Sequence, residues 1–324
     1  MEVIKIKFLK SFNSLTHMFE VDTIRPEKLV KMTDMGHIKE VMCVDRLSLS
    51  PPPITKIDRD LYMLNETGEV REYQHTENRS QNVDNLRRTF KQIRHIINFN
   101  FSGGGNELAF TLTYVENMTD TKRLYFDFDK FMKQLRYHYG KDIDYFSVVE
   151  PQGRGAWHCH VLLRFNAFDK IYIPNEEIAR MWGQGFVTVK AIRKDVDNLG
   201  AYLSAYLGDI ELTLENKGVV EECCPGDVGQ YEIKTVEVDG VEKRFIKGGR
   251  LHLYPTGMNI YRKSRGIKIP DSSYMSYSEA KKIVGSATPN YSSMVCIFDD
   301  EDTEVNRIIY EQYNLKRKQS QDGE

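Results

Sequence analysis

The sequence has few of the features that mark secreted or membrane proteins. Its five cysteines are an odd number and form no CxxC pair. A disulfide framework or a cysteine-based zinc finger is therefore not expected, and a reducing cytoplasm is the expected location. No apolar run approaches the roughly 20 residues that a membrane span needs, and the opening MEVIKIKFLK lacks the apolar region of a signal peptide. These absences argue against both secretion and membrane insertion.

The chain also lacks an overall charge, because 45 basic side chains face 47 acidic ones over 324 residues and leave a net charge of −2. The distribution is uneven, and residues 85–270 carry 27 basic and 23 acidic side chains. Within them, 85–98 has no acid, and 241–268 has eight basic residues, one acid and interleaved tyrosines. Such stripes fit a polyanion such as DNA, although solvated helices and hairpins also collect Lys and Arg. The candidate DNA-binding residues are Arg87, Arg88, Lys91, Arg94, Arg250, Arg262, Lys263 and Arg265.

Hydrophobic periodicity predicts an α+β domain over 85–270, with its motif-bearing core at 108–209. Helical spacing of apolar residues predicts helices over 85–98, 124–139 and 197–207, and alternation predicts strands over 108–114, 143–150, 158–165 and 185–192. Adjacent strands joined by a short turn favour an antiparallel sheet with helices packed on it. Residues 1–84 are expected to form an accessory segment and 271–324 a charged C-terminal tail, both poorly defined.

A pair of histidines suggests a metal site. His158 and His160 stand at i and i+2 of a predicted strand, so their side chains share one face. If 143–150 and 158–165 pair across their seven-residue connection, opposite residues have numbers that sum to 308, which places Glu150 opposite His158 and diagonal to His160. Two imidazoles and a carboxylate fit Mg²⁺ or Mn²⁺, and also suit Zn²⁺. The structural alternative is a chance His-x-His with each ring bonded to a backbone carbonyl.

Two tyrosines provide a candidate nucleophile. Tyr202 and Tyr206 are four residues apart on a predicted helix and so share a face. A tyrosine forms covalent intermediates when the developing charge is stabilised, and a metal that polarises a phosphodiester provides that stabilisation. Core tyrosines with their hydroxyls at the rim are the alternative. Thr111 and Thr113 share a face of the strand 108–114, where they either bond to DNA and the ligands or simply fill the strand.

Taken in order, FTLTY, a glutamate ahead of WHCH and a helix with Y-x-x-x-Y resemble the three motifs of HUH endonucleases. The resemblance covers about 85–270 and is strongest to rolling-circle replication initiators of plasmids and of filamentous or microvirus-type phages. It implies a site-specific single-strand nick at a replication origin. His158, His160 and Glu150 would hold a divalent metal against the scissile phosphate. Tyr202 or Tyr206 would attack it, leaving a 5′-phosphotyrosyl link and a free 3′-OH for a host polymerase.

The sequence departs from this family pattern at one place, and other functions stay open. Helices of this kind usually carry a lysine three residues after each tyrosine, where this chain has Ala205 and Asp209. A relaxase or transposase would use the same chemistry, a non-catalytic DNA-binding initiator or regulator would lack it, and a structural zinc protein would need its metal to fold. No GxxxxGK[ST] motif occurs, so unwinding by a host helicase is expected. The origin sequence and the oligomeric state do not follow from the sequence.

Overall fold

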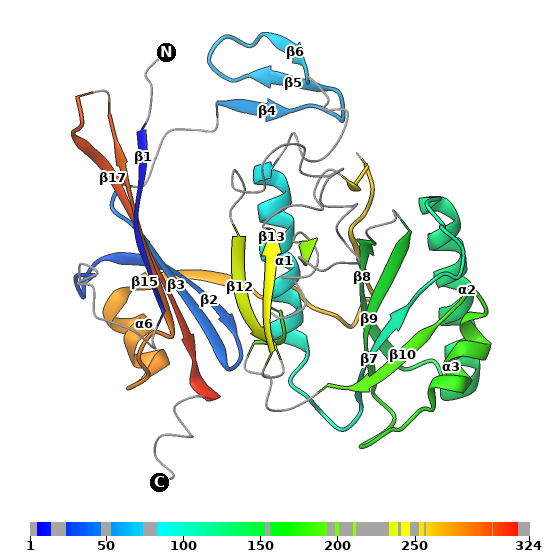
Figure 1. Ribbon diagram of the computed structural model, residues 1–324. Helices are drawn as coiled ribbons and strands as arrows, with labels where there is room; N and C mark the ends of the chain where they lie inside the picture. Colours follow the sequence, from blue (N-terminus) through cyan, green and yellow to red (C-terminus); the bar gives the residue numbers. More distant parts are fainter. Residues whose placement is uncertain are drawn as a thin grey trace. The chain divides into compact units, whose positions relative to one another are not determined.

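The computed structural model describes residues 5–13, 24–46, 53–73, 83–152, 156–192, 198–200, 210–211, 233–238, 241–246, 253–255, 257–299 and 301–316. Within these ranges the α+β class is confirmed, because four helices accompany sheets whose paired strands are antiparallel (Figure 1). Clustering of contacts divides the chain into two compact units, Met1–His75 with Asp271–Glu324, and Thr76–Pro270. In the part of the chain described, no helix combines the length and the apolar character needed to cross a membrane.

The unit Thr76–Pro270 contains a five-stranded antiparallel sheet in the order β10-β7-β9-β8-β14. Its strands are β7 (Glu107–Leu112), β8 (Ile143–Pro151), β9 (Trp157–Phe165), β10 (Val187–Ala191) and β14 (Tyr261–Lys263). The predicted strands are therefore confirmed with small shifts at their ends. A separate three-stranded sheet, β11-β13-β12, is formed by β11 (Ile210–Glu211), β12 (Ile233–Val238) and β13 (Val241–Ile246).

Helices cover both faces of the five-stranded sheet (Figure 1). Helix α1 (Val83–Asn100) lies on one face and buries Leu86, Ile93 and Ile97, as its apolar spacing predicts. Helices α2 (Thr121–Tyr139) and α3 (Asn175–Trp182) lie on the other. The α2 helix begins at Asp120, whose carboxylate accepts bonds from two backbone N–H groups of the first turn. Because both sheet faces are covered, β9 is almost entirely apolar apart from its histidines and Arg164.

The unit Met1–His75 with Asp271–Glu324 contains a six-stranded antiparallel sheet in the order β1-β16-β17-β3-β2-β15. Its elements are β1 (Lys5–Asn13), β2 (Leu29–Met35), β3 (Ile38–Val44), β15 (Ser272–Ser276), α6 (Tyr277–Val284), β16 (Tyr291–Phe298) and β17 (Glu304–Asn314). A smaller sheet is formed by β4 (Ile54–Lys56), β5 (Leu61–Leu64) and β6 (Val70–Glu72). Side chains of α6, β2, β3 and β17 make a separate apolar core.

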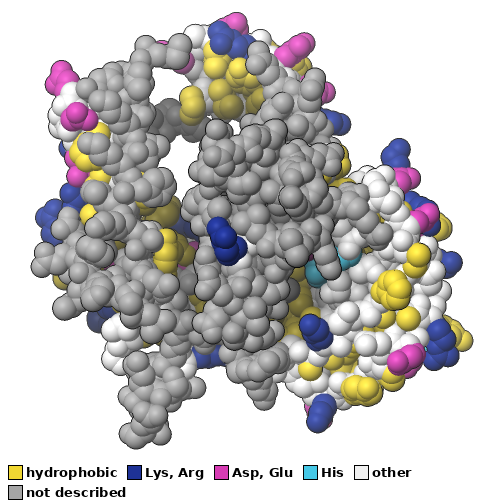
Figure 2. Space-filling model, viewed as in Figure 1, with side chains coloured by type: hydrophobic (Ala, Val, Ile, Leu, Met, Phe, Trp, Pro, Cys, Tyr) yellow, Lys and Arg dark blue, Asp and Glu magenta, His cyan; other side chains and the backbone are white. Residues whose placement is uncertain are grey.

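This arrangement corrects the expectation of a charged tail over 271–324. The segment leaves the site-bearing unit at Pro270, as expected, but Ser272–Asn314 forms three strands and a helix in the same sheet as β1–β3. The acids are compatible with strands because many lie on solvated positions or in ion pairs, such as Glu304 with Arg307 at 2.7 Å. On the face shown in Figure 2, basic, acidic and hydrophobic side chains are intermingled over the described surface.

Candidate metal and nucleotidyl-transfer site

The predicted strand register is confirmed. Glu150 pairs with His158 and Val148 with His160, so each pair across β8 and β9 sums to 308. Residues directly opposite in an antiparallel pair share a face, and so do residues two apart on a strand. Glu150, His158 and His160 therefore lie on one face of the sheet.

Glu150 and His160 are in direct contact. The Nε2 atom of His160 lies 2.7 Å from Oε2 of Glu150, whose side chain is only 7% exposed. On the other side of the ring, Nδ1 lies 3.3 Å from Oγ1 of Thr111, which is the cross-strand neighbour of His160 on β7. Burial lowers the pKa of His160 to about 4, so the ring is a neutral imidazole at neutral pH. Neutral imidazole is the form that binds metals, and a bonded partner at Nδ1 fixes the direction of Nε2.

His158 is on the same face but makes a different contact. Its ring centre lies 6.2 Å from that of His160, and its Nε2 atom is in hydrogen-bond contact with the side-chain amide of Gln152. Across the described residues, no group of three His, Cys, Asp or Glu side chains converges as a metal site. The structure thus brings two of the three predicted ligands together and leaves the third turned toward Gln152.

The donor chemistry of these residues fits a divalent cation. A carboxylate and two neutral imidazoles are ordinary ligands for Mn²⁺ and Zn²⁺, and the 2.7 Å between Nε2 and Oε2 is close to the roughly 3 Å that separates neighbouring ligands of one metal. Gln152 was missed by the sequence analysis. The alternation that selected Glu150 continues to residue 152, so this amide was detectable as a neighbour of the histidines.

The beginning of the predicted tyrosine helix is anchored on α1. The Asn98 side chain accepts a bond from the backbone N–H of Gly200 at 2.8 Å and donates to Asn198 at 2.9 Å. A Cβ at Gly200 would lie 2.5 Å from the carbonyl oxygen of Arg94, so only glycine permits this approach. Tyr202 and Tyr206 lie outside the described residues, and so do Ala205 and Asp209.

The basic residues of α1 differ in exposure. Arg88 and Arg94 are exposed on the helix, and Lys91 is half-buried. The backbone of Arg87 belongs to α1, but its side chain is outside the described part, and Arg250 is outside it entirely. The helix therefore offers two exposed guanidinium groups to a polyanion.

The predicted DNA-binding residues at β14 separate into two kinds. Arg262 points to the α2 face, where its guanidinium pairs with Asp129 at 3.0 Å and lies 5.4 Å from the ring centre of Tyr125. Lys263 donates to the backbone carbonyl of Ile267 at 2.6 Å. Arg265, in the following loop, is exposed. Arg262 and Lys263 are thus already bonded within the protein, and Arg265 faces solvent.

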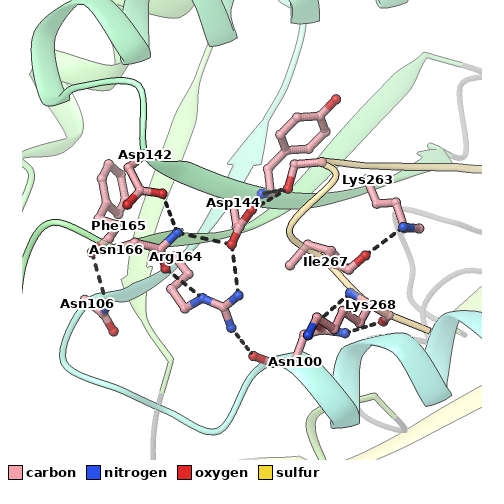
Figure 3. Close-up of polar contacts among 12 residues, drawn as sticks. Asn100, Asn106, Asp142, Asp144, Arg164, Phe165, Asn166, Lys263, Ile267 and Lys268 are labelled. Atoms are coloured by element: carbon pink, nitrogen blue, oxygen red, sulfur yellow. Dashed lines mark hydrogen bonds and ion pairs between the residues drawn. The ribbon is translucent and has the colours of Figure 1, made fainter. Parts of the chain in front are cut away.

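A polar network holds this loop against the sheet (Figure 3). The carboxylate of Asp144 on β8 accepts bonds from Arg164 at 2.9 Å, Asn166 at 3.1 Å and Ser264 at 2.9 Å. Burial raises the pKa of Asp144, but the bonds from Asn166, Arg164 and Ser264 outweigh burial and lower it below its ordinary value. A Cβ at Gly266 would overlap this carboxylate, so the loop requires glycine there.

The same network extends to the end of α1. Arg164 donates to the backbone carbonyl of Asn100 at 2.9 Å. The Asn100 side chain in turn bonds the backbone of Lys268, accepting from its N–H at 3.0 Å and donating to its carbonyl at 2.7 Å. The loop after β14, the sheet and α1 are therefore joined by the same set of polar contacts.

Comparison with known proteins gives one match. Residues 107–211, from the first residue of β7 to the last of β11, match the model of the Replication-associated protein ORF2 family. No curated protein and no solved structure matches the chain. The matched segment contains Glu150, His158, His160 and both candidate tyrosines, and it supports a replication-associated role consistent with a rolling-circle initiator. Over residues 107–211, this chain therefore carries a domain similar to the ORF2-type replication-associated proteins.

Proposed function

We propose that this protein is a replication initiator that nicks single-stranded origin DNA by attack of a tyrosine. The observation that carries the proposal is the contact of Glu150 with His160 on the sheet face that also holds His158, inside the segment matched to the replication-associated family. In the proposed reaction the oxygen of Tyr202 or Tyr206 bonds to the scissile phosphorus and its proton is lost. The bond from phosphorus to the 3′ oxygen breaks, and this oxygen takes up a proton.

The chain's own residues have separate tasks in this proposal. Glu150, His158 and His160 would hold Mg²⁺ or Mn²⁺, which supplies positive charge to the phosphodiester. Thr111 would keep the His160 ring in its orientation through Nδ1. Asn98 would position the start of the tyrosine helix through Asn198 and Gly200. The products are a 5′-phosphotyrosyl link and a free 3′-OH, which a host polymerase would extend after a host helicase opens the duplex.

A covalent adduct is the direct test. The protein is incubated with Mn²⁺ and circular single-stranded DNA of the replicon that encodes it, and then run on a denaturing protein gel. We expect a slower band that disappears when both Tyr202 and Tyr206 are changed to Phe, and the two single changes identify the attacking residue. If the double variant still forms the band, the attacking residue is not one of these tyrosines.

Metal binding is tested separately by titrating Mn²⁺ calorimetrically. We expect Glu150→Gln to weaken Mn²⁺ binding at least about tenfold, because a charged ligand is lost while the bond to His160 can persist. Glu116→Gln is the matched control, since Glu116 is an exposed glutamate of the same unit, paired with Arg123 at 2.6 Å. Equal Mn²⁺ affinity in both variants would remove Glu150 from the ligand set.

A non-catalytic DNA-binding initiator or regulator is the second candidate. Ala205 and Asp209 stand where related helices carry lysines, and Asp209 adds negative charge near a phosphate-binding helix. Retained Mn²⁺ and DNA binding without any adduct or nick would favour this function.

A further inference from the structure

An exposed aromatic side chain precedes the edge strand β10. The pairing of β10 with β7 continues to Phe186, because the backbone N–H and the hydroxyl of Thr113 both donate to its carbonyl, at 3.0 and 2.8 Å. The side chain of Phe186 is nevertheless 77% exposed. Along β10, Val187 and Val189 pack against the core, whereas Thr188 is exposed. Alternation therefore places Phe186, Thr188 and Lys190 together on the opposite face.

The backbone that carries Phe186 is rigidly held. A Cβ at Gly185 would lie 2.6 Å from the carbonyl oxygen of Thr113, so the chain enters β10 in close contact with β7. Just before it, the buried Trp182 donates its indole N–H to the same carbonyl at 2.7 Å and packs edge-on against Tyr114. An exposed ring on such a backbone loses little conformational freedom when it binds a ligand.

The face that carries Phe186 is the face of the candidate metal site. Thr188 pairs with Thr111, and Thr111 pairs with His160, so these three residues form one row across β10, β7 and β9. Phe186 lies two residues along from this row and two strands from β9. Typical strand spacing and rise therefore place it about 12 Å from His160. Lys190, two residues along on the other side of the row, is exposed and carries a positive charge.

We propose that Phe186, Thr188 and Lys190, the β10 strip, bind single-stranded DNA beside the Glu150–His160 pair. Phe186 stacks on an unpaired base, and Lys190 binds a backbone phosphate within a few nucleotides of the scissile one. An aromatic side chain next to a basic one on an open sheet face is the combination that binds single strands. The inference rests on the proposed function in taking DNA as the substrate.

A polypeptide strand is the other occupant that an edge strand attracts, and the structure argues against it. The backbone N–H of Val189 points away from β7 and donates to the Asn175 side chain at 2.8 Å. An added strand would need this N–H, and the charged Lys190 also disfavours strand addition. DNA needs only the side chains of the strip.

The test is fluorescence anisotropy of the full-length protein with a labelled single-stranded oligonucleotide from its replicon, in EDTA so that the metal site does not contribute. We expect Phe186→Ala to weaken binding about ten- to hundredfold, as loss of one base–aromatic stack does. Phe126→Ala is the matched control, because Phe126 is 69% exposed but lies on α2, over the opposite face. Lys190→Gln should lower the slope of log affinity against log salt by about one phosphate contact.

The outcomes separate this inference from the proposed function. Equal affinity of Phe186→Ala and Phe126→Ala would overturn the strip, even if the wild-type protein forms the tyrosyl adduct. An equal loss by Phe186→Ala on a blunt duplex would also overturn it, because paired bases do not stack on a side chain. A selective loss on single strands, in a protein that forms no adduct, would sustain the strip and reject the nicking function.

Discussion

Replacing Asp144 with asparagine removes the negative charge at the centre of the network in Figure 3. Three donors share this carboxylate, Arg164, Asn166 and Ser264, and an amide of the same shape turns its own donor toward at least one of them. The Asp144 and Arg164 side chains are 15% and 26% exposed, so the pair is neither fully buried nor a surface pair. We therefore expect Asp144→Asn to lower the free energy of unfolding by about 2–3 kcal/mol.

The assay is urea unfolding followed by circular dichroism at neutral pH. Asp142→Asn is the matched control, because Asp142 also accepts a bond from Asn166, at 2.9 Å, but is exposed. We expect this control to lose about 0.5 kcal/mol or less. Equal stability of the two variants would refute the argument that the Asp144 network stabilises the fold.

The pH dependence gives the same prediction an independent check. Because the pKa of Asp144 is lowered in the folded protein, its stabilisation is complete above the pKa of the unfolded chain, about 4. It is lost as the pH falls through the lower, folded pKa. The stability difference between wild type and Asp144→Asn should therefore shrink below about pH 4. A difference that stays constant into this range would show that the charge of Asp144 is not its cause.

Two further changes test the positioning of the site. Gly185→Ala should lower the free energy of unfolding by about 1–3 kcal/mol, because the new Cβ meets the Thr113 carbonyl at 2.6 Å and backbone cannot give way cheaply; an unchanged melting temperature would contradict the close approach. Asn98→Ala should slow adduct formation without changing Mn²⁺ affinity, because Gly200 and Asn198 lose their contact with α1. An adduct rate equal to wild type would mean that this contact does not position the tyrosine helix.

Much of the site could be predicted because strand geometry is local. Alternation with a period of two and a seven-residue connection left one antiparallel register for β8 and β9, and this register places Glu150 with His158 and His160. The same alternation applied to 185–192 would have placed Phe186 on the face of His160. It was overlooked because the search for nucleic-acid contacts followed clusters of charge, and this strand carries a single lysine.

Residue type and local charge did not determine which charges are available to a ligand. Arg262 belongs to a basic stretch of the sequence, but it lies beside Ser147 on the face covered by α2 and pairs there with Asp129. Only the packing of a distant helix against β14 decides this. Likewise, the turn of His158 toward Gln152 depends on the side-chain arrangement at the end of the hairpin.

The amino-acid sequence by itself determined the α+β class, the strand pair with its register, and the common face of the three candidate ligands, because each follows from periodicity within a few residues. Only the tertiary structure decided that Ser272–Asn314 joins the N-terminal strands, with Ile309 opposite Cys43, and that the start of the tyrosine helix is anchored on α1. Such pairings join residues far apart in the chain. They depend on which strand edges and helix surfaces remain unpartnered after the rest has folded, and periodicity carries no information about that.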